Sequence, residues 1–165
     1  DTRKTYPPAP PGKELYEMIL EYDLSRFVDA HKRSYDRALA EIRNGYKASH
    51  WMWYIFPQIQ GLGRSSSARY YAIRDLDEAM AFISHPYLGG NLREISEALL
   101  QLDSNDPVAV MGWPDDLKLR SCMTLFANAC EDNEVFLKVL EKYYGGKPDG
   151  ETLKILRSQA ESGDL

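Results

Sequence analysis

The side chains best suited to hold an anion are concentrated between positions 44 and 74 of the chain. Lys47, Arg64, Arg69 and Arg74 lie in this stretch together with seven aromatic residues, and it contains no Asp or Glu. The whole chain of 165 residues nevertheless has a net charge of -5. Arginine and lysine bind phosphate and carboxylate groups, and aromatic rings stack on flat ligands. The stretch therefore predicts part of a binding site for something anionic and flat.

The segment SHWMWYIFPQ, residues 49–58, contains two tryptophans and a histidine. Trp51 and Trp53 are two positions apart, so they face different sides of a helix and one of them can line a groove. The same rings are equally suited to filling a core. His50 is a candidate general acid or base, because its charge changes near neutral pH. A hydrogen-bonded structural histidine is the alternative, because no carboxylate stands at a spacing that identifies a partner.

A glycine-rich turn, Gly61-Leu62-Gly63-Arg64-Ser65, follows. It lacks the Gly-Lys-Ser/Thr ending of a phosphate-binding P-loop, and it lacks the third glycine and the preceding strand of a dinucleotide fingerprint. The serines at 65–67 can cap a helix whose first N–H groups favour an anion. A plain turn between helices is the alternative. The predicted ligand contacts of this region are Arg64, Ser65, Arg69 and Tyr71.

Polar side chains also interrupt the predicted helix 115–130, which is apolar on most of its sides. We call Asp116, Lys118, Arg120, Ser121 and Thr124 the polar stripe. Long cations are rarely buried without a partner. The stripe therefore either forms an internal salt bridge, for example with Asp116, or lines an anion-holding cavity. We predict that Lys118, Ser121 and Thr124 contact the ligand and that Asp116 handles protons.

The sequence gives little support to metal or thiol chemistry. His31, His50 and His85 stand in none of the spacings typical of metal ligands, so neither a metal nor another cofactor is predicted. Cys122 and Cys130 are eight positions apart on one predicted helix, roughly 12 Å by helix rise, which is too far for a disulfide. We expect two reduced core thiols, which suits a cytoplasmic protein.

The composition is that of a soluble globular domain, with 44% hydrophobic and 27% charged residues. No apolar run approaches the roughly 20 residues of a membrane span, so no membrane association is expected. An isoelectric point near 5.2 makes broad nucleic-acid binding unlikely, because such binding needs a net basic face.

The periodicity of apolar residues predicts an all-α fold, a single compact domain of about seven to nine helices. No alternating strand bounded by hairpin turns is present. We expect a flexible proline-rich arm at 1–12, the helical domain at 13–158 and a polar tail at 159–165. Within the domain, helices are expected to begin at Asp23 or Ser25, to stop before Pro86 and to restart at Asn91.

Three segments carry a resemblance to a known family. SHWMWYIFPQIQGLGRSSSARYYAI, DLDEAMAFISHPYLGGNLREI and DDLKLRSCMTLFANA resemble the family called domain of unknown function 1810. The resemblance covers roughly residues 24–156. It implies a mainly α-helical fold, and some members have been labelled calpastatin-like, but it supplies no established reaction.

Two classes of function follow from these residues. The first is a binder or enzyme for a small anionic molecule, nucleotide-like or a sugar phosphate. Arg64, Arg69 and Lys118 would hold phosphate on one cavity, and Trp51, Trp53 or Tyr71 would stack on a ring. N-glycosidic hydrolysis, as in proteins that act on ADP-ribose, is the first reaction to consider. The second class is a protein-interaction module, with a protein partner bound through an aromatic patch or the proline-rich arm. Single-stranded nucleic acid is a third option.

Overall fold

A computed structural model describes residues 22–163 of the chain. Over this range the chain forms nine helices and no strand, which confirms the all-α prediction. The proline-rich arm at 1–12 lies outside the described residues. The helices are α2 (Ser25–Arg43), α3 (Met52–Ile55), α4 (Ser66–Tyr70), α5 (Leu76–Ser84), α6 (Pro86–Leu100), α7 (Pro107–Met111), α8 (Asp115–Ala129), α9 (Glu134–Tyr144) and α10 (Gly150–Gly163).

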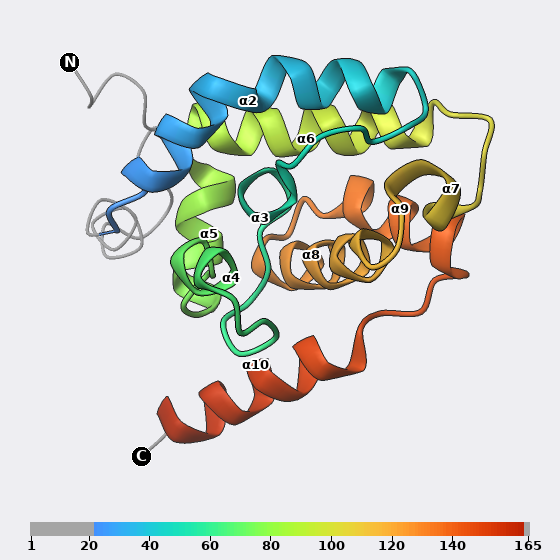
Figure 1. Cartoon of the computed structure of the whole chain (residues 1–165). Coiled ribbons are helices and arrows are strands. Elements are labelled where there is room, and N and C mark those ends of the chain that lie inside the picture. The colour runs from blue at the N-terminus through green and yellow to red at the C-terminus, as the bar shows by residue number, and fades with distance from the viewer. Residues whose placement is uncertain (1–21, 164–165) are drawn as a thin grey trace.

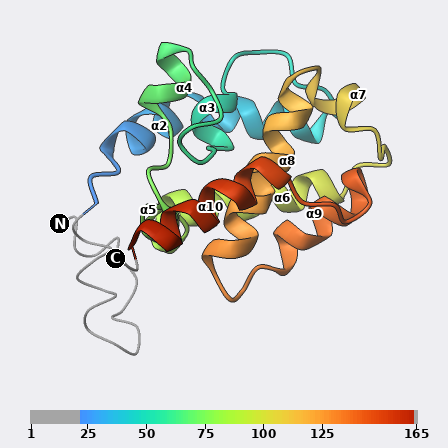
Figure 2. The same ribbon diagram turned by 90° about the horizontal axis from the view of Figure 1, so that it is seen from below.

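Helix α8 lies in the middle of the fold, as its distribution of apolar residues predicts. α2 and α6 pack together on one side of it, while α5 and α9 pack directly against it (Figure 1). α10 crosses α8 on the opposite side from α2 (Figure 2). Nine of the fifteen residues of α8 are buried, whereas α10 buries only Thr152. The C-terminal helix α10 therefore packs on the outside of the other helices and contributes little to the core.

A chain of aromatic contacts joins the helices around α8. The ring centroids of Phe27 in α2 and Phe82 in α5 are 5.0 Å apart. Phe82 lies 5.4 Å from Phe126 of α8, which lies 6.0 Å from Phe136 of α9. All four side chains are fully buried. Tilted and edge-to-face pairs of this kind add to the gain from burial, so this line of rings defines the centre of the core.

The junction between α5 and α6 differs from the expected one. The helix that we expected at Asn91 begins five residues earlier, at Pro86. His85 Nδ1 accepts two backbone N–H groups of the first turn, at 3.2 and 3.3 Å, and proline at the first helical position needs no partner. Gly89 allows the two helices to meet closely, because a Cβ there would lie 2.0 Å from the carbonyl oxygen of Ile83.

At the N-terminal end α2 begins at Ser25, one of the two expected positions, whereas the C-terminal end departs from expectation. α2 is preceded by Leu24 at the cap position, and Asp23 instead accepts the backbone N–H of Ser25 at 2.9 Å. At the other end α10 continues to Gly163, so residues 159–163 of the expected polar tail are helical. The polar composition of this segment is that of an exposed helix face.

Candidate functional site

The segment Gln58–Ile73, which we call the cavity loop, leaves the core and returns to it. Ile59 and Ile73, both buried, pair as two short parallel segments. The Ile73 N–H donates to the carbonyl of Gln58 at 2.9 Å, and the Gln60 N–H donates to the carbonyl of Ile73 at 2.8 Å. The two ends of the loop are therefore held side by side, as in the compact surface loops that often carry function.

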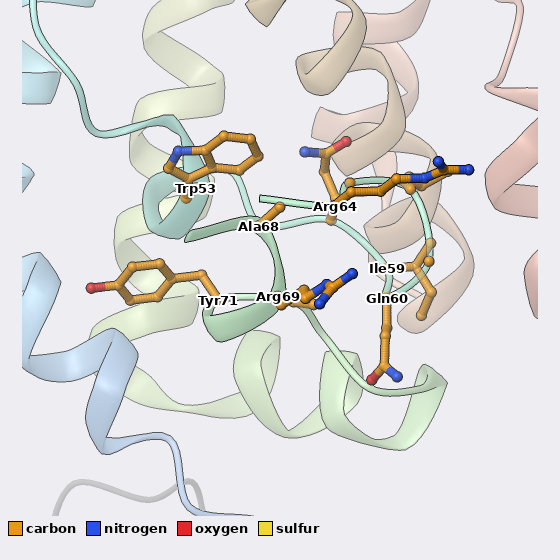
Figure 3. A pocket seen from close by; sticks show the side chains of 12 residues that line it. Trp53, Ile59, Gln60, Arg64, Ala68, Arg69 and Tyr71 are labelled. Atoms are coloured by element: carbon orange, nitrogen blue, oxygen red, sulfur yellow. The ribbon is translucent and has the colours of Figure 1, made fainter. Parts of the chain in front are cut away.

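A cavity of about 460 Å³ lies between the cavity loop and Trp53 of α3 (Figure 3). We call it the large cavity because it is the larger of the two cavities that Trp53 lines; a hollow of about 600 Å³ lies elsewhere, between the start of α5 and α10. Close packing inside the loop shapes the large cavity, because a Cβ on Gly63 would lie only 2.6 Å from the Cβ of Ala68. The short helix α4 that carries Ala68 is capped by Ser65, whose Oγ accepts the Ala68 N–H at 3.1 Å. The turn at position 63 thus needs glycine for steric reasons.

The large cavity is lined by two arginines and by no carboxylate among the described residues. Arg64 and Arg69 are exposed, and neither side chain forms an ion pair or hydrogen bond within the described part of the chain. Their side chains extend in the same direction from the loop in Figure 3. The amides of Gln58 and Gln60 add uncharged donors and acceptors to the lining. The arrangement suits an anionic group such as phosphate or carboxylate.

Two aromatic residues border the large cavity in different ways. Tyr71 points away from Arg69 in Figure 3, and its ring packs on Tyr54, with centroids 5.0 Å apart. Trp53 is half-buried and lines the cavity on its α3 side. The ammonium of Lys118 lies over the Trp53 ring, with Nζ 3.8 Å from the centroid. Trp53 is therefore the aromatic side chain best placed to meet a ligand ring.

A second cavity of about 170 Å³ shares Trp53 as a wall. Asp115 joins two lysines there: its Oδ2 lies 2.8 Å from Lys47 Nζ and its Oδ1 lies 3.1 Å from Lys118 Nζ. Lys47 also donates to the carbonyl of Ser49 at 2.7 Å. Burial raises the pKa of Asp115, but the two ammonium groups outweigh that effect and lower the pKa below its ordinary value. The group keeps one more positive than negative charge.

Glu41 of α2 holds the chain that leads into this region. Its carboxylate accepts hydrogen bonds from Ser49 Oγ at 2.5 Å, the Ala48 N–H at 2.7 Å, Trp51 Nε1 at 2.9 Å and the Ser49 N–H at 3.0 Å. Burial raises the pKa of Glu41, but these hydrogen bonds outweigh it and lower the pKa to about 2. One carboxylate thus fixes the approach to α3 and the position of Trp53.

Comparison with known proteins identifies the family of this chain and a similar solved structure. A family model described as "Protein of unknown function (DUF1810)" matches residues 21–156. The chain belongs to the DUF1810 family. The crystal structure of the conserved hypothetical protein Rv1873 from Mycobacterium tuberculosis is similar, with 44% sequence identity and a TM-score of 0.81, over 82% of this chain and 97% of that one. A search of curated proteins finds no match. Neither the family description nor the name of the similar structure states an activity.

In this DUF1810 chain the predicted contacts of residues 49–71 are divided among three places. Arg64, Arg69, Tyr71 and Trp53 line the large cavity. Ser65 is exposed and caps α4. The two remaining residues, His50 and Trp51, line the second cavity, where His50 is exposed and Trp51 is buried with its indole N–H on Glu41.

The lower part of the polar stripe holds the start of α10. Ser121 Oγ lies 3.0 Å from Asp149 Oδ2, and Thr124 Oγ1 accepts the Asp149 N–H at 2.8 Å. Asp149 Oδ2 also accepts the N–H and hydroxyl of Thr152, at 3.1 and 2.5 Å. Arg120 donates to the carbonyls of residues 147 and 148 at 2.9 and 3.1 Å. These side chains dock the chain ahead of α10, and neither cavity includes Ser121 or Thr124.

The two stripe residues nearest the start of α8, Asp116 and Lys118, do not form the salt bridge that was considered for them. Lys118 pairs with Asp115 and not with Asp116, and it reaches the second cavity. Arg64 and Lys118 therefore border different cavities, on two sides of Trp53. Asp116 is buried, and its Oδ1 has no hydrogen-bond partner among the described residues. Its carbonyl accepts the Tyr144 hydroxyl at 2.5 Å, and burial followed by the charge of Asp116 raises the pKa of Tyr144.

Four residues that shape the site were not predicted as site residues. Gln58 and Gln60 alternate around buried Ile59, a period of two typical of extended chain, and this pattern could have placed both amides on one side. Lys47 is in the basic stretch, and Asp115 precedes a helix, so each has an ordinary structural explanation in the sequence. Only the fold brings these last two within 2.8 Å.

Two further observations concern the described residues as a whole. No group of three or more His, Cys, Asp or Glu side chains in residues 22–163 is arranged so that it could hold a metal ion. None of the helices in that range combines the length and apolar character needed to cross a membrane.

Proposed function

We propose that this protein binds a small anionic ligand that carries a flat ring, of the nucleotide or sugar-phosphate class, in the large cavity. One observation carries the proposal: a cavity of about 460 Å³ is lined by two arginines without partners among the described residues and by no carboxylate. Its volume falls within the range of about 300–1,000 Å³ that small-molecule sites occupy.

The chemistry of the lining supports an anion with a ring. Each guanidinium of Arg64 and Arg69 offers paired N–H donors that match a phosphate or carboxylate, and neither has to break an internal ion pair to do so. Trp53 supplies a ring on which a base can stack, a contact worth about 1–3 kcal/mol in nucleic-acid complexes. The amides of Gln58 and Gln60 supply hydrogen bonds for hydroxyl or base edges.

Binding is better supported than hydrolysis. No described residue that lines the large cavity is a His, Asp, Glu, Cys or Lys, the side chains that most often transfer protons in catalysis, and the ring of Tyr71 points away from Arg69 (Figure 3). His50 lies in the second cavity, and Asp116 is buried beside Tyr144. Transfer of a proton to a ligand in the large cavity would require either side chain to move past Trp53 or out of the core.

A protein-interaction surface is the second candidate. Trp113, 75% exposed, stands directly before α8, and Leu117 and Val108 are 50% and 46% exposed on the neighbouring helices α8 and α7. Tryptophan is enriched among interface hot spots, and apolar neighbours such as Leu117 and Val108 can exclude water around it. These residues lie outside the linings of both cavities, so this candidate and the ligand site involve different surfaces.

A thermal-shift titration tests the ligand site. The panel is inorganic phosphate, ribose 5-phosphate, AMP, ADP and ADP-ribose, applied to the parent protein and to Arg64→Ala/Arg69→Ala. A ligand at about 100 times its Kd should raise the Tm by about 5–10 °C for a chain of this length. The double variant should unfold at the parent temperature without ligand and lose this shift.

Arg33→Ala/Arg37→Ala is the matched control. It removes the same charge from two exposed positions on α2 that line neither cavity. This variant should keep the full ligand-induced shift. If no member of the panel stabilises the parent, or if both double variants lose the shift equally, the proposed site is wrong.

A further inference from the structure

Trp53 stands between the large cavity and a fixed positive charge. Its ring lines both cavities, and Lys118 Nζ lies 3.8 Å from its centroid on the side of the second cavity. An ammonium at this distance is attracted by the negative charge density on the face of an indole ring. The indole surface that borders the large cavity therefore belongs to a ring that already holds one cation.

The ammonium of Lys118 is not free to move away from the ring. Asp115 Oδ1 holds it at 3.1 Å, and the other oxygen of Asp115 is held by Lys47 at 2.8 Å. The Lys47 side chain is only 8% exposed, and its ammonium also donates to the Ser49 carbonyl. Two lysines share one carboxylate, so the group behind Trp53 keeps a net positive charge. The second cation is thus built into the wall of the site.

We infer that the ring which packs against Trp53 is an uncharged one, so that the ligand class is a nucleotide with a neutral base and not one with a cationic ring. This inference rests on the proposed ligand site. A cationic ring on the large-cavity side of Trp53 would share the indole with the ammonium that already lies over its other side, and it would lie close to Lys118, Arg64 and Arg69 without a carboxylate in the lining to compensate. A neutral purine or dihydropyridine ring avoids both costs and keeps its phosphate on the arginines.

Two pairs of probes differ chiefly in the charge of the ring. Nicotinamide mononucleotide carries a cationic ring and its reduced form a neutral one, with the same ribose and phosphate. AMP and 1-methyladenosine 5′-monophosphate form a second pair, in which the methylated base is cationic at neutral pH. Isothermal titration of the parent protein should show at least one pair in which the neutral member binds about tenfold more tightly.

Variants at position 118 assign the discrimination to the ammonium. Lys118→Met keeps an apolar side chain of similar length over the indole and removes the charge, so the preference should fall to about threefold or less, the remainder coming from the arginines. Lys118→Arg keeps a cation on the ring and should keep the preference of the parent. Circular dichroism and Tm measurements on both variants report whether each is folded.

The outcomes separate this inference from the proposed function. Equal affinity for neutral and cationic members of both pairs, with binding lost in Arg64→Ala/Arg69→Ala, would overturn the inference and leave the ligand site standing. A tenfold preference that is unchanged in folded Lys118→Met would also overturn it, because the arginines alone would then discriminate. Failure of every probe to bind would overturn the site and the inference with it.

Discussion

The cavity loop and the polar stripe of α8 are both rich in polar side chains, but their polar groups are satisfied in different ways. In the stripe, Ser121, Thr124 and Arg120 are bonded to the chain that precedes α10. In the loop, Arg64 and Arg69 have no partner among the described residues. The hydrogen bonds of the stripe attach α10 to α8, whereas the two arginine side chains of the loop remain available to a ligand.

This difference shows which polar residues of a small helical domain are candidates for binding. A buried hydroxyl on an apolar helix needs a partner inside the protein, and Thr124, fully buried, has two. An exposed arginine needs none. An arginine beside a cavity without carboxylates is a candidate for ligand binding, because no contact within the described residues accounts for its position. Stability and ligand binding should therefore respond to changes in different regions.

Loss of the stripe's main partner should have the largest effect on stability. Asp149→Ala removes the acceptor shared by Ser121 and Thr152 and the cap of α10, and we expect the free energy of unfolding to fall by about 3 kcal/mol. Urea unfolding followed by circular dichroism measures the loss. Asp149→Asn keeps a capping oxygen and should lose about 1 kcal/mol. A loss below about 0.5 kcal/mol in Asp149→Ala would show that the stripe does not attach α10.

The buried histidine of α2, His31, should make the stability of the protein depend on pH. Burial is the main cause that lowers the pKa of His31 to about 4, and its ring nitrogens are paired with the Tyr54 carbonyl at 2.8 Å and the Asn91 amide at 3.0 Å. Because the unfolded state, with a pKa near 6.5, binds the proton more readily, stability is complete above about pH 6.5 and falls as the pH is lowered toward 4.

We expect His31 to contribute a loss of about 2 kcal/mol between pH 7 and pH 4.5. Urea unfolding at the two pH values measures it, and His31→Gln provides the comparison. The variant should be less stable at pH 7 but should show a smaller difference between the two pH values. An identical difference in parent and variant would mean that His31 is not the group that titrates.

A methyl group in the cavity loop should have the smallest effect on stability and a large one on binding. In Gly63→Ala the new Cβ would lie 2.6 Å from that of Ala68, so we expect a loss of about 1 kcal/mol as α4 shifts. Gly90→Ala is the control, since a Cβ there meets nothing within 4 Å. Differential scanning calorimetry and the ligand titration report both effects. Unchanged ligand affinity in Gly63→Ala would show that ligand binding does not depend on the close packing of the turn at position 63.

Much of the helical body could be predicted from the sequence. The apolar period of α8 and the cap at Ser65 each depend on a few neighbouring residues, and the structure has both. The expected end before Pro86 is confirmed, because α5 ends at Ser84, but the expected restart at Asn91 was wrong because His85 rarely serves as a cap and proline usually marks the end of a helix. A common cap residue was not always a reliable signal, since Leu24 and not Asp23 stands at the cap position of α2.

The site could be predicted only in part. Its arginines and Trp53 stand out in the sequence because they share one acid-free stretch. The bonds of Ser121 and Thr124 depend on Asp149, 28 and 25 positions away, and the contact of Lys118 with Trp53 spans 65 positions in the opposite direction. Neither contact corresponds to a residue spacing in the sequence that would have predicted it. A polar stripe on a buried helix looks the same whether it faces a cavity or a neighbouring helix.

The backbone pairing of Ile59 with Ile73 makes the cavity loop a modular insertion. The chain departs from and returns to nearly the same point of the core, so the entropy of closing the loop depends only weakly on its length. We expect a shorter connection between these two isoleucines to preserve the path of α3 and α5. It would remove α4 and the large cavity, together with the contacts that Leu62 and Tyr71 make with the core.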